Sequence, residues 1–166
     1  SVVLHMSFIK SIKKNSEKIS LYKLNDKVLK KSFHEVDLFT ECLKVCFLDL
    51  ETTGTDKLND KIIEIGIKLL KIDKKNGQII SIDSTYESFN DPNMALSEKI
   101  TKITGISSQM VKNQRIDWNI VQSIVEKSDI LVAHNASFDR AFLDRYLAIS
   151  NNKIWACSIN DVDWIE

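Results

Sequence analysis

The sequence is poor in several residue types, and each shortage excludes a class of protein. Its three cysteines are odd in number and form no CxxC pair, which argues against a disulfide framework and a zinc site. Proline occurs once and glycine four times, and no low-complexity segment or internal repeat is present. No apolar run approaches the roughly 18 residues of a membrane span, and the first residues do not resemble a signal peptide. We therefore expect a protein of the reducing cytoplasm with no membrane partner.

The composition is that of a globular protein, with 43% hydrophobic and 28% charged residues. The 166 residues suit one domain with a sizeable core. The net charge is zero, but residues 1–44 carry +4 and residues 45–166 carry −4. We interpret residues 1–44 as a basic N-terminal extension with a helix at about 27–43. A solvated lysine-rich helix is favoured there over an arm that holds a polyanion.

Residues 45–166 show the patterns of a mixed α/β domain. The apolar run at 45–50 predicts a buried strand, and alternation at 61–72 predicts a second strand with one polar face. The Asn76-Gly77 turn leads to a third strand at 78–89. These three strands are expected to form an antiparallel meander.

The later part of the domain is predicted to alternate helices with strands. Ser97 is expected to cap a helix at 98–103 that Gly105 ends, and a second apolar stripe predicts a helix from about 116 to 127. A strand at 129–133, a helix from Ser137 to Ile149 and a last strand at 154–157 follow. The fold class is therefore α/β, with a mixed five-stranded sheet flanked by helices.

Two carboxylates stand at the end of the first core strand. Asp49 and Glu51 follow the apolar residues 45–48 and precede Thr52-Thr53-Gly54. Residues at i and i+2 of a strand project to the same face, so these side chains lie side by side. They repel each other unless a cation lies between them. Mg²⁺ or Mn²⁺ suits an all-oxygen site of this kind.

A second candidate site lies at 131–139. A strand is expected to end at Ala133, a turn containing His134 and Asn135 follows, and Asp139 falls in the first turn of the next helix. An aspartate there, taken alone, is most simply a favourable charge at the positive end of the helix dipole. Together with Asp49 and Glu51, however, it can complete one metal cluster.

The segment Asp49-Leu50-Glu51-Thr52-Thr53-Gly54 resembles the first motif of the DEDD exonuclease superfamily, which has a ribonuclease H-like fold. His134-Asn135-Ala136-Ser137-Phe138-Asp139 resembles its second motif, and Ile103–Ser107 between them is also similar to this group. The superfamily includes the proofreading epsilon subunit of bacterial DNA polymerase III and ribonuclease T. The resemblance covers about residues 45–166 and leaves 1–44 outside.

The resemblance implies hydrolysis of phosphodiester bonds from 3′ ends of single-stranded DNA or RNA, with two Mg²⁺ or Mn²⁺ ions and DNA polymerase components as partners. Asp49 would bridge the two metals, Glu51 would bind one of them, and Asp139 would serve the second. The nucleotide-binding residues would be Thr52, Thr53, Gly54, Ile106, His134, Asn135 and Phe138. For His134 we favour a positioning role over that of a base, whereas Ile106 and Phe138 could equally be core residues.

The third motif of this family is missing from the 166 residues. That motif lies on a final helix and supplies a His or Tyr base and a last metal-binding Asp. No histidine follows His134, and Asp161 and Asp163 come too soon after the last strand. We therefore expect a C-terminally truncated domain that lacks its final helix. Either the natural protein continues past Glu166, or this is a decayed copy that binds nucleic acid or a replication partner without cleaving.

Overall fold

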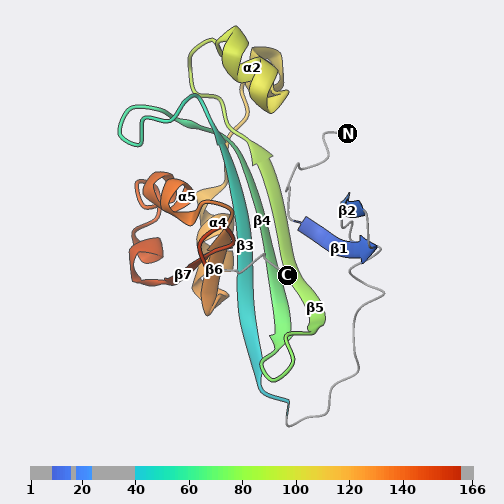
Figure 1. Ribbon diagram of the computed structural model, residues 1–166. Helices are drawn as coiled ribbons and strands as arrows, with labels where there is room; N and C mark the ends of the chain where they lie inside the picture. The colour runs from blue at the N-terminus through green and yellow to red at the C-terminus, as the bar shows by residue number, and fades with distance from the viewer. Residues whose placement is uncertain (1–8, 16–17, 24–39, 162–166) are drawn as a thin grey trace.

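The computed structural model describes residues 9–15, 18–23 and 40–161 (Figure 1). Near the N-terminus, β1 (Ile9–Asn15) and β2 (Lys18–Lys23) pair as an antiparallel hairpin. Residues 1–24 show no clear periodicity, so this hairpin was not predicted. Most of the helix predicted at 27–43 lies outside the described residues, but its last two residues belong to a strand. That end of the prediction is wrong.

The domain is built on a five-stranded sheet with the order β5-β4-β3-β6-β7. Its strands are β3 (Cys42–Thr52), β4 (Ile62–Asp73), β5 (Ile79–Phe89), β6 (Ile130–Ala133) and β7 (Ile154–Cys157). The first three pair antiparallel, and β6 and β7 continue the sheet in parallel with β3. The predicted meander and the mixed α/β sheet are therefore confirmed.

The main core lies between one face of the sheet and two helices, α4 (Trp118–Lys127) and α5 (Ala136–Leu143). Leu48 on β3, Val121 on α4 and Phe142 on α5 are fully buried in this core. Figure 1 shows both helices on the same side of the sheet. Of the helices in the described residues, the longest has 10 residues, and none could cross a membrane. The alternation of β3 therefore places Asp49 and Glu51 on the face opposite these helices.

A smaller cluster packs at the end of the sheet, under α2 (Glu98–Thr104) and α3 (Ser108–Val111). It contains the buried residues Ile63, Ile106 and Val111. The predicted cap of α2 is confirmed, since the Ser97 side chain accepts a hydrogen bond from Ile100 N at 3.2 Å. The short helix α3 was not predicted, because four residues are too few to show a period.

Gly105 ends α2 in the left-handed region, with φ of 76°. A Cβ atom added at Gly105 would meet nothing within 4 Å, so backbone conformation alone requires glycine. Gly105→Ala is expected to lower the free energy of unfolding by about 1 kcal/mol. Gly105→Asn is expected to lower it less, because asparagine tolerates this conformation. Urea unfolding of the two variants checks this, and equal losses would contradict it.

The helix predicted from Ser137 to Ile149 is shorter in the structure. α5 ends at Leu143, and a 3₁₀ helix follows at Ala148–Asn152. The last turns tighten because Arg145 N bonds to Phe142 O and Tyr146 N bonds to Leu143 O. The Tyr146 ring stacks on Trp118 of α4, with centroids 4.5 Å apart. This contact of the turn with α4, which a helical period does not reveal, accompanies the end of α5.

Candidate active site

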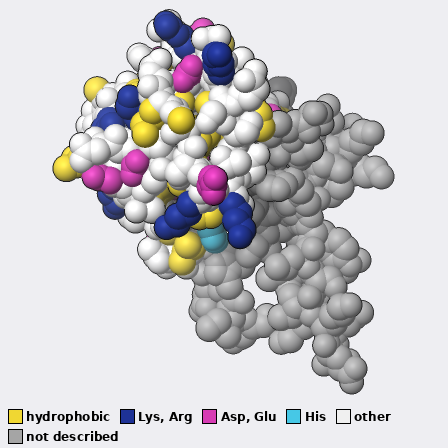
Figure 2. All heavy atoms as spheres, turned by 90° about the horizontal axis from the view of Figure 1, so that it is seen from above, with side chains coloured by type: hydrophobic (Ala, Val, Ile, Leu, Met, Phe, Trp, Pro, Cys, Tyr) yellow, Lys and Arg dark blue, Asp and Glu magenta, His cyan; other side chains and the backbone are white. Residues whose placement is uncertain are grey.

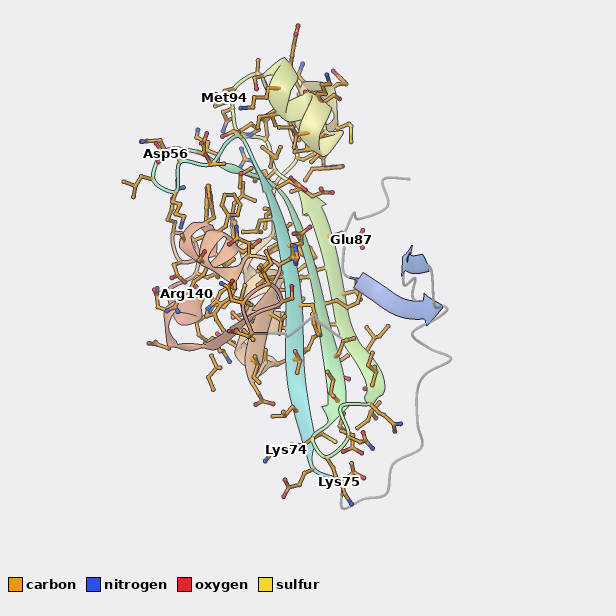
Figure 3. The ribbon with its side chains drawn as sticks, in the orientation of Figure 1. Asp56, Lys74, Lys75, Glu87, Met94 and Arg140 are labelled. Carbon is orange, nitrogen blue, oxygen red and sulfur yellow. The ribbon has the colours of Figure 1, made fainter. Side chains whose placement is uncertain are left out.

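Asp49 and Glu51 lie near the end of β3, where the sheet adds further carboxylates. In the register with β4, Glu51 faces Glu64 and Asp49 faces Gly66. Gly66 in turn faces Glu87 on β5, which Figure 3 shows on the side of the sheet away from α5. Directly opposed residues of paired strands share a face. One face of the sheet therefore carries four acidic side chains close together.

Asp139 reaches the same strand from α5, past the end of β6. β6 pairs with β3 only at Val45–Phe47, so the next part of that strand edge is open to α5. There Leu50 N donates a hydrogen bond to Asp139 Oδ1 at 3.1 Å. Asp139 as a whole is only 2% exposed to solvent. The structure thus brings the carboxylate of the second motif to the residue between Asp49 and Glu51.

Burial raises the pKa of all three carboxyl groups, and repulsion by neighbouring carboxylates adds to this effect at Glu51 and Asp139. Burial, followed by the charge of Asp49, raises the pKa of Asp139 to about 8, although the bond from Leu50 acts in the opposite direction. Burial raises the pKa of Asp49 to about 6, against the effect of nearby His134. Burial and the charges of Asp49 and Glu64 raise the pKa of Glu51 to about 7. A cation between the three side chains would stabilise the ionised form of each carboxyl group.

The segment after Glu51 folds into a closed turn. Thr52 is buried, and its hydroxyl donates to Gly54 O at 2.6 Å. The Thr53 hydroxyl donates to Asp60 Oδ1 at 2.7 Å. Both threonine hydroxyls therefore donate their protons within the protein, and not toward the outside.

The turn between β6 and α5 places three of the predicted nucleotide-binding residues. His134 and Asn135 are exposed, and Phe138 is partly buried against the main core. The ring nitrogen Nδ1 of His134 lies 2.9 Å from Ser158 Oγ, which fixes the ring orientation. Asn135 starts α5 in the left-handed region, with φ of 72°. Ile106 is apart from this turn, 2% exposed in the smaller cluster, which leaves little of its side chain for a nucleotide.

Several residues around the site were missed by the sequence reasoning. Glu64 could have been found, because the polar face of the second strand contains it and antiparallel pairing puts that face beside Glu51. Burial and the charges of Asp49 and Glu87 raise the pKa of Glu64 to about 6. No sequence pattern indicates Asp60 or Arg145 as site residues, because their contacts depend on how the loop between β3 and β4 folds.

The donor set fits a hard divalent cation, because Asp49, Glu51 and Asp139 all present oxygen and destabilise one another when ionised. Over the described part of the chain, however, no three or more His, Cys, Asp or Glu side chains are arranged to hold a metal ion. The Asp139 carboxylate is instead turned to Leu50 N. These carboxylates would therefore have to reorient to hold a cation together.

Comparison with known families identifies the chain. The model of an exonuclease family matches residues 46–162. The chain belongs to this family, and the predicted membership of the DEDD exonuclease superfamily is confirmed.

Curated relatives are much longer than this chain. A PolC-type DNA polymerase III from Caldanaerobacter subterraneus subsp. tengcongensis is 43% identical over 97 residues, which are 57% of this chain and 6% of the relative. The corresponding protein of Listeria monocytogenes is 38% identical over 116 residues, which are 68% of this chain and 8% of the relative. The chain thus spans less than a tenth of the length of these relatives.

Solved structures agree on the fold. Exonuclease I from Methylocaldum szegediense is 19% identical, with a TM-score of 0.54 over 72% of this chain and 28% of its own. Exonuclease I of E. coli in complex with a dT13 oligonucleotide is 14% identical, with a TM-score of 0.55 over 75% and 32%. At this identity the likeness shows the sheet architecture alone, and it confirms the predicted ribonuclease H-like fold.

Proposed function

We propose that this chain is a 3′→5′ exonuclease domain that hydrolyses phosphodiester bonds at the ends of single-stranded nucleic acid. The hydrogen bond from Leu50 N to Asp139 Oδ1 carries the proposal. It brings the carboxylate of the second motif to the strand that holds Asp49 and Glu51. Family membership supports the same reaction class.

Asp49, Glu51 and Asp139 would hold Mg²⁺ or Mn²⁺, two ions in a complete site. Such ions, when bound, lower the pKa of water and neutralise charge on the attacking and leaving oxygens. The chain itself supplies the negative charge that attracts them. It also orients these carboxylates, since β3 fixes two of them and the Leu50 N–H restrains the third.

The terminal nucleotide would lie between the segment Thr52–Gly54 and the turn at His134–Asn135, with Phe138 beside it. The bond to Ser158 holds the His134 ring in one orientation, which suits a positioning role. Because the hydroxyls of Thr52 and Thr53 donate within the protein, we expect this segment to contact the nucleotide through its backbone and its methyl groups.

Single-stranded DNA is the substrate we favour, with a replicative polymerase as the partner. The relatives are PolC-type DNA polymerases III, and one fold neighbour was solved with an oligonucleotide. Basic, acidic and hydrophobic side chains are mixed on the end of the domain that carries α2 (Figure 2). Recognition would therefore depend on local contacts rather than on a broad positive field. The cytoplasm is the compartment we expect.

A labelled oligonucleotide tests the proposal. A single strand labelled at its 5′ end should be shortened one nucleotide at a time in Mn²⁺, and EDTA should stop the reaction. A circular strand of the same sequence should stay intact, because it has no end. Cutting of the circle would contradict an exonuclease and favour a ribonuclease H-like endonuclease.

Binding without cleavage is the second candidate, because Asp161, the one acidic residue described after β7, lies in a turn. After β7, the Asp161 carboxylate accepts a hydrogen bond from Cys157 N at 2.6 Å and closes a turn. Asp161 is therefore a turn residue and not the helical aspartate of a third motif. Fluorescence anisotropy that detects binding of the linear strand, with no shortening in Mn²⁺, would establish this alternative.

A further inference from the structure

The Asp60 side chain joins the two ends of the loop between β3 and β4. Its Oδ1 accepts a hydrogen bond from the Thr53 hydroxyl at 2.7 Å, and its Oδ2 accepts one from Asp56 N at 2.8 Å. The Thr53 hydroxyl also accepts a bond from Lys61 N at 3.0 Å, and Thr53 N donates to Lys61 O at 2.9 Å. Thr53 is thus fixed by three hydrogen bonds, and the Asp60 carboxylate lies at the centre of the loop.

The Asp60 carboxylate occupies the space that a side chain at position 54 would need. A Cβ added at Gly54 would overlap the carboxylate, lying 2.8 Å from its Cγ and 2.9 Å from Oδ1. Two hydrogen bonds hold that carboxylate in place, so it cannot move aside without breaking them. The family resemblance counted this glycine among the nucleotide-binding residues. The structure supplies a different reason, which is internal to the loop.

Arg145 ties this closed loop to the element that carries Asp139. Its Nη1 donates to Asp60 O at 2.7 Å and to Lys57 O at 3.1 Å. Its guanidinium carbon lies 5.7 Å from the centroids of the Phe142 and Tyr146 rings, which is within cation–π range.

A second tie runs from the loop to the start of α5. Lys57 Nζ donates to Ser137 O at 3.3 Å. Within α5, the Phe142 ring that Arg145 contacts lies 4.8 Å from the Phe138 ring. Figure 3 shows Asp56 in the loop above α5, the helix that carries Arg140. The loop and α5 are therefore joined on one side of the sheet by several contacts.

We propose that Asp60 and Arg145 are positioning residues that fix Thr53 and Gly54 relative to α5 and so determine how well the terminal nucleotide binds. This inference rests on the proposed exonuclease function. Neither side chain belongs to the carboxylate cluster. Substrate binding depends on accurate placement of the segments that hold the substrate, so the loss of these bonds should be measurable in KM.

Steady-state kinetics on the labelled single strand in Mn²⁺ provide the test. Asp60→Asn puts an NH₂ group opposite a hydrogen-bond donor, and Arg145→Met removes both bonds to the loop carbonyls. Each should raise KM by about tenfold, the effect of losing one charge-assisted hydrogen bond, while kcat changes by less than about twofold. Thr53→Val should act like Asp60→Asn, because it removes the hydroxyl that donates to Asp60. Arg140→Met is the matched control, since this arginine also bonds a carbonyl, Asn151 O, but not the loop.

A double-mutant cycle tests the role of Gly54 directly. Gly54→Ala should raise KM in the wild-type protein but add nothing in Asp60→Ala, where the space for the methyl group is open. The same added factor in both backgrounds would overturn the inference, because the nucleotide would then require the glycine. An unchanged KM in Asp60→Asn and Arg145→Met would also overturn it.

The outcomes separate this inference from the proposed function. A wild-type protein that binds the strand without shortening it refutes the exonuclease proposal alone. The dissociation constants of the same variants, measured by fluorescence anisotropy, then replace KM as the readout. A wild-type protein that neither shortens nor binds the strand overturns both.

Discussion

Asp49→Asn is expected to reduce Mn²⁺-dependent shortening of a single-stranded oligonucleotide by about 10³-fold, the upper range for removing one electrostatic contributor in an active site. Asparagine keeps the shape of the side chain but presents one neutral oxygen and an NH₂ group that repels a cation. Asp49 is also the carboxylate whose charge acts on both Glu51 and Asp139. Its replacement therefore weakens the negative field of the whole cluster. Single-turnover rates with labelled substrate measure the loss.

Two controls separate lost chemistry from lost folding. Glu41→Gln removes an exposed acid that pairs with Lys74 at 3.3 Å near the start of β3, and it should leave the rate unchanged. Asp49→Asn should unfold at a temperature no lower than the wild type without metal, because a repulsive charge is gone. If Asp49→Asn keeps wild-type activity, Asp49 does not bind the catalytic metal.

The sequence predicted the sheet well because each strand has a local period, but strand ends were less accurate. The first strand was expected at 45–50, and β3 extends from Cys42 to Thr52. Cys42 faces Asp73 across a long hairpin, and Thr52 faces Ile62 next to a register shift. Pairing between distant segments lengthens the strand, and no local pattern in 42–44 indicates it.

The candidate site was predictable to the extent that it depends on short motifs. The alternation of one strand put Asp49 and Glu51 on one face, and the strand–turn–helix pattern put Asp139 at the start of α5. The bond from Leu50 N to Asp139 could not be predicted, because it requires β6 to stop short of the end of β3. Asp60 was missed for a similar reason, since its partners depend on how a nine-residue loop closes.

Asp139→Asn is expected to stabilise the metal-free protein at pH 8 while lowering its Mn²⁺-dependent activity by about 10²–10³-fold. The amide oxygen can still accept the Leu50 N–H, so the fold is kept. The raised pKa of Asp139, about 8, means that the folded protein holds this proton at pH values where the unfolded chain has released it. Stability from this group is therefore complete below the ordinary pKa of 3.8 and is lost as the pH rises through about 8. Asparagine has no proton to lose, so the advantage of the variant should grow from pH 5 to pH 8.

Urea unfolding in EDTA at the two pH values measures this advantage, and Asp129→Asn is the matched control. Asp129 also accepts a backbone N–H of β3, from Lys44 at 2.7 Å, but at an exposed position. The gain of Asp139→Asn at pH 8 should exceed that of Asp129→Asn, because only Asp139 lies buried beside the charge of Asp49. Mg²⁺ should then stabilise the wild type more than Asp139→Asn, because only a protein that binds the ion when folded gains from it. If Asp139→Asn is no more stable than the wild type at pH 8, burial and the charge of Asp49 do not destabilise the ionised Asp139 carboxylate. The argument that these carboxylates attract a cation would then be wrong.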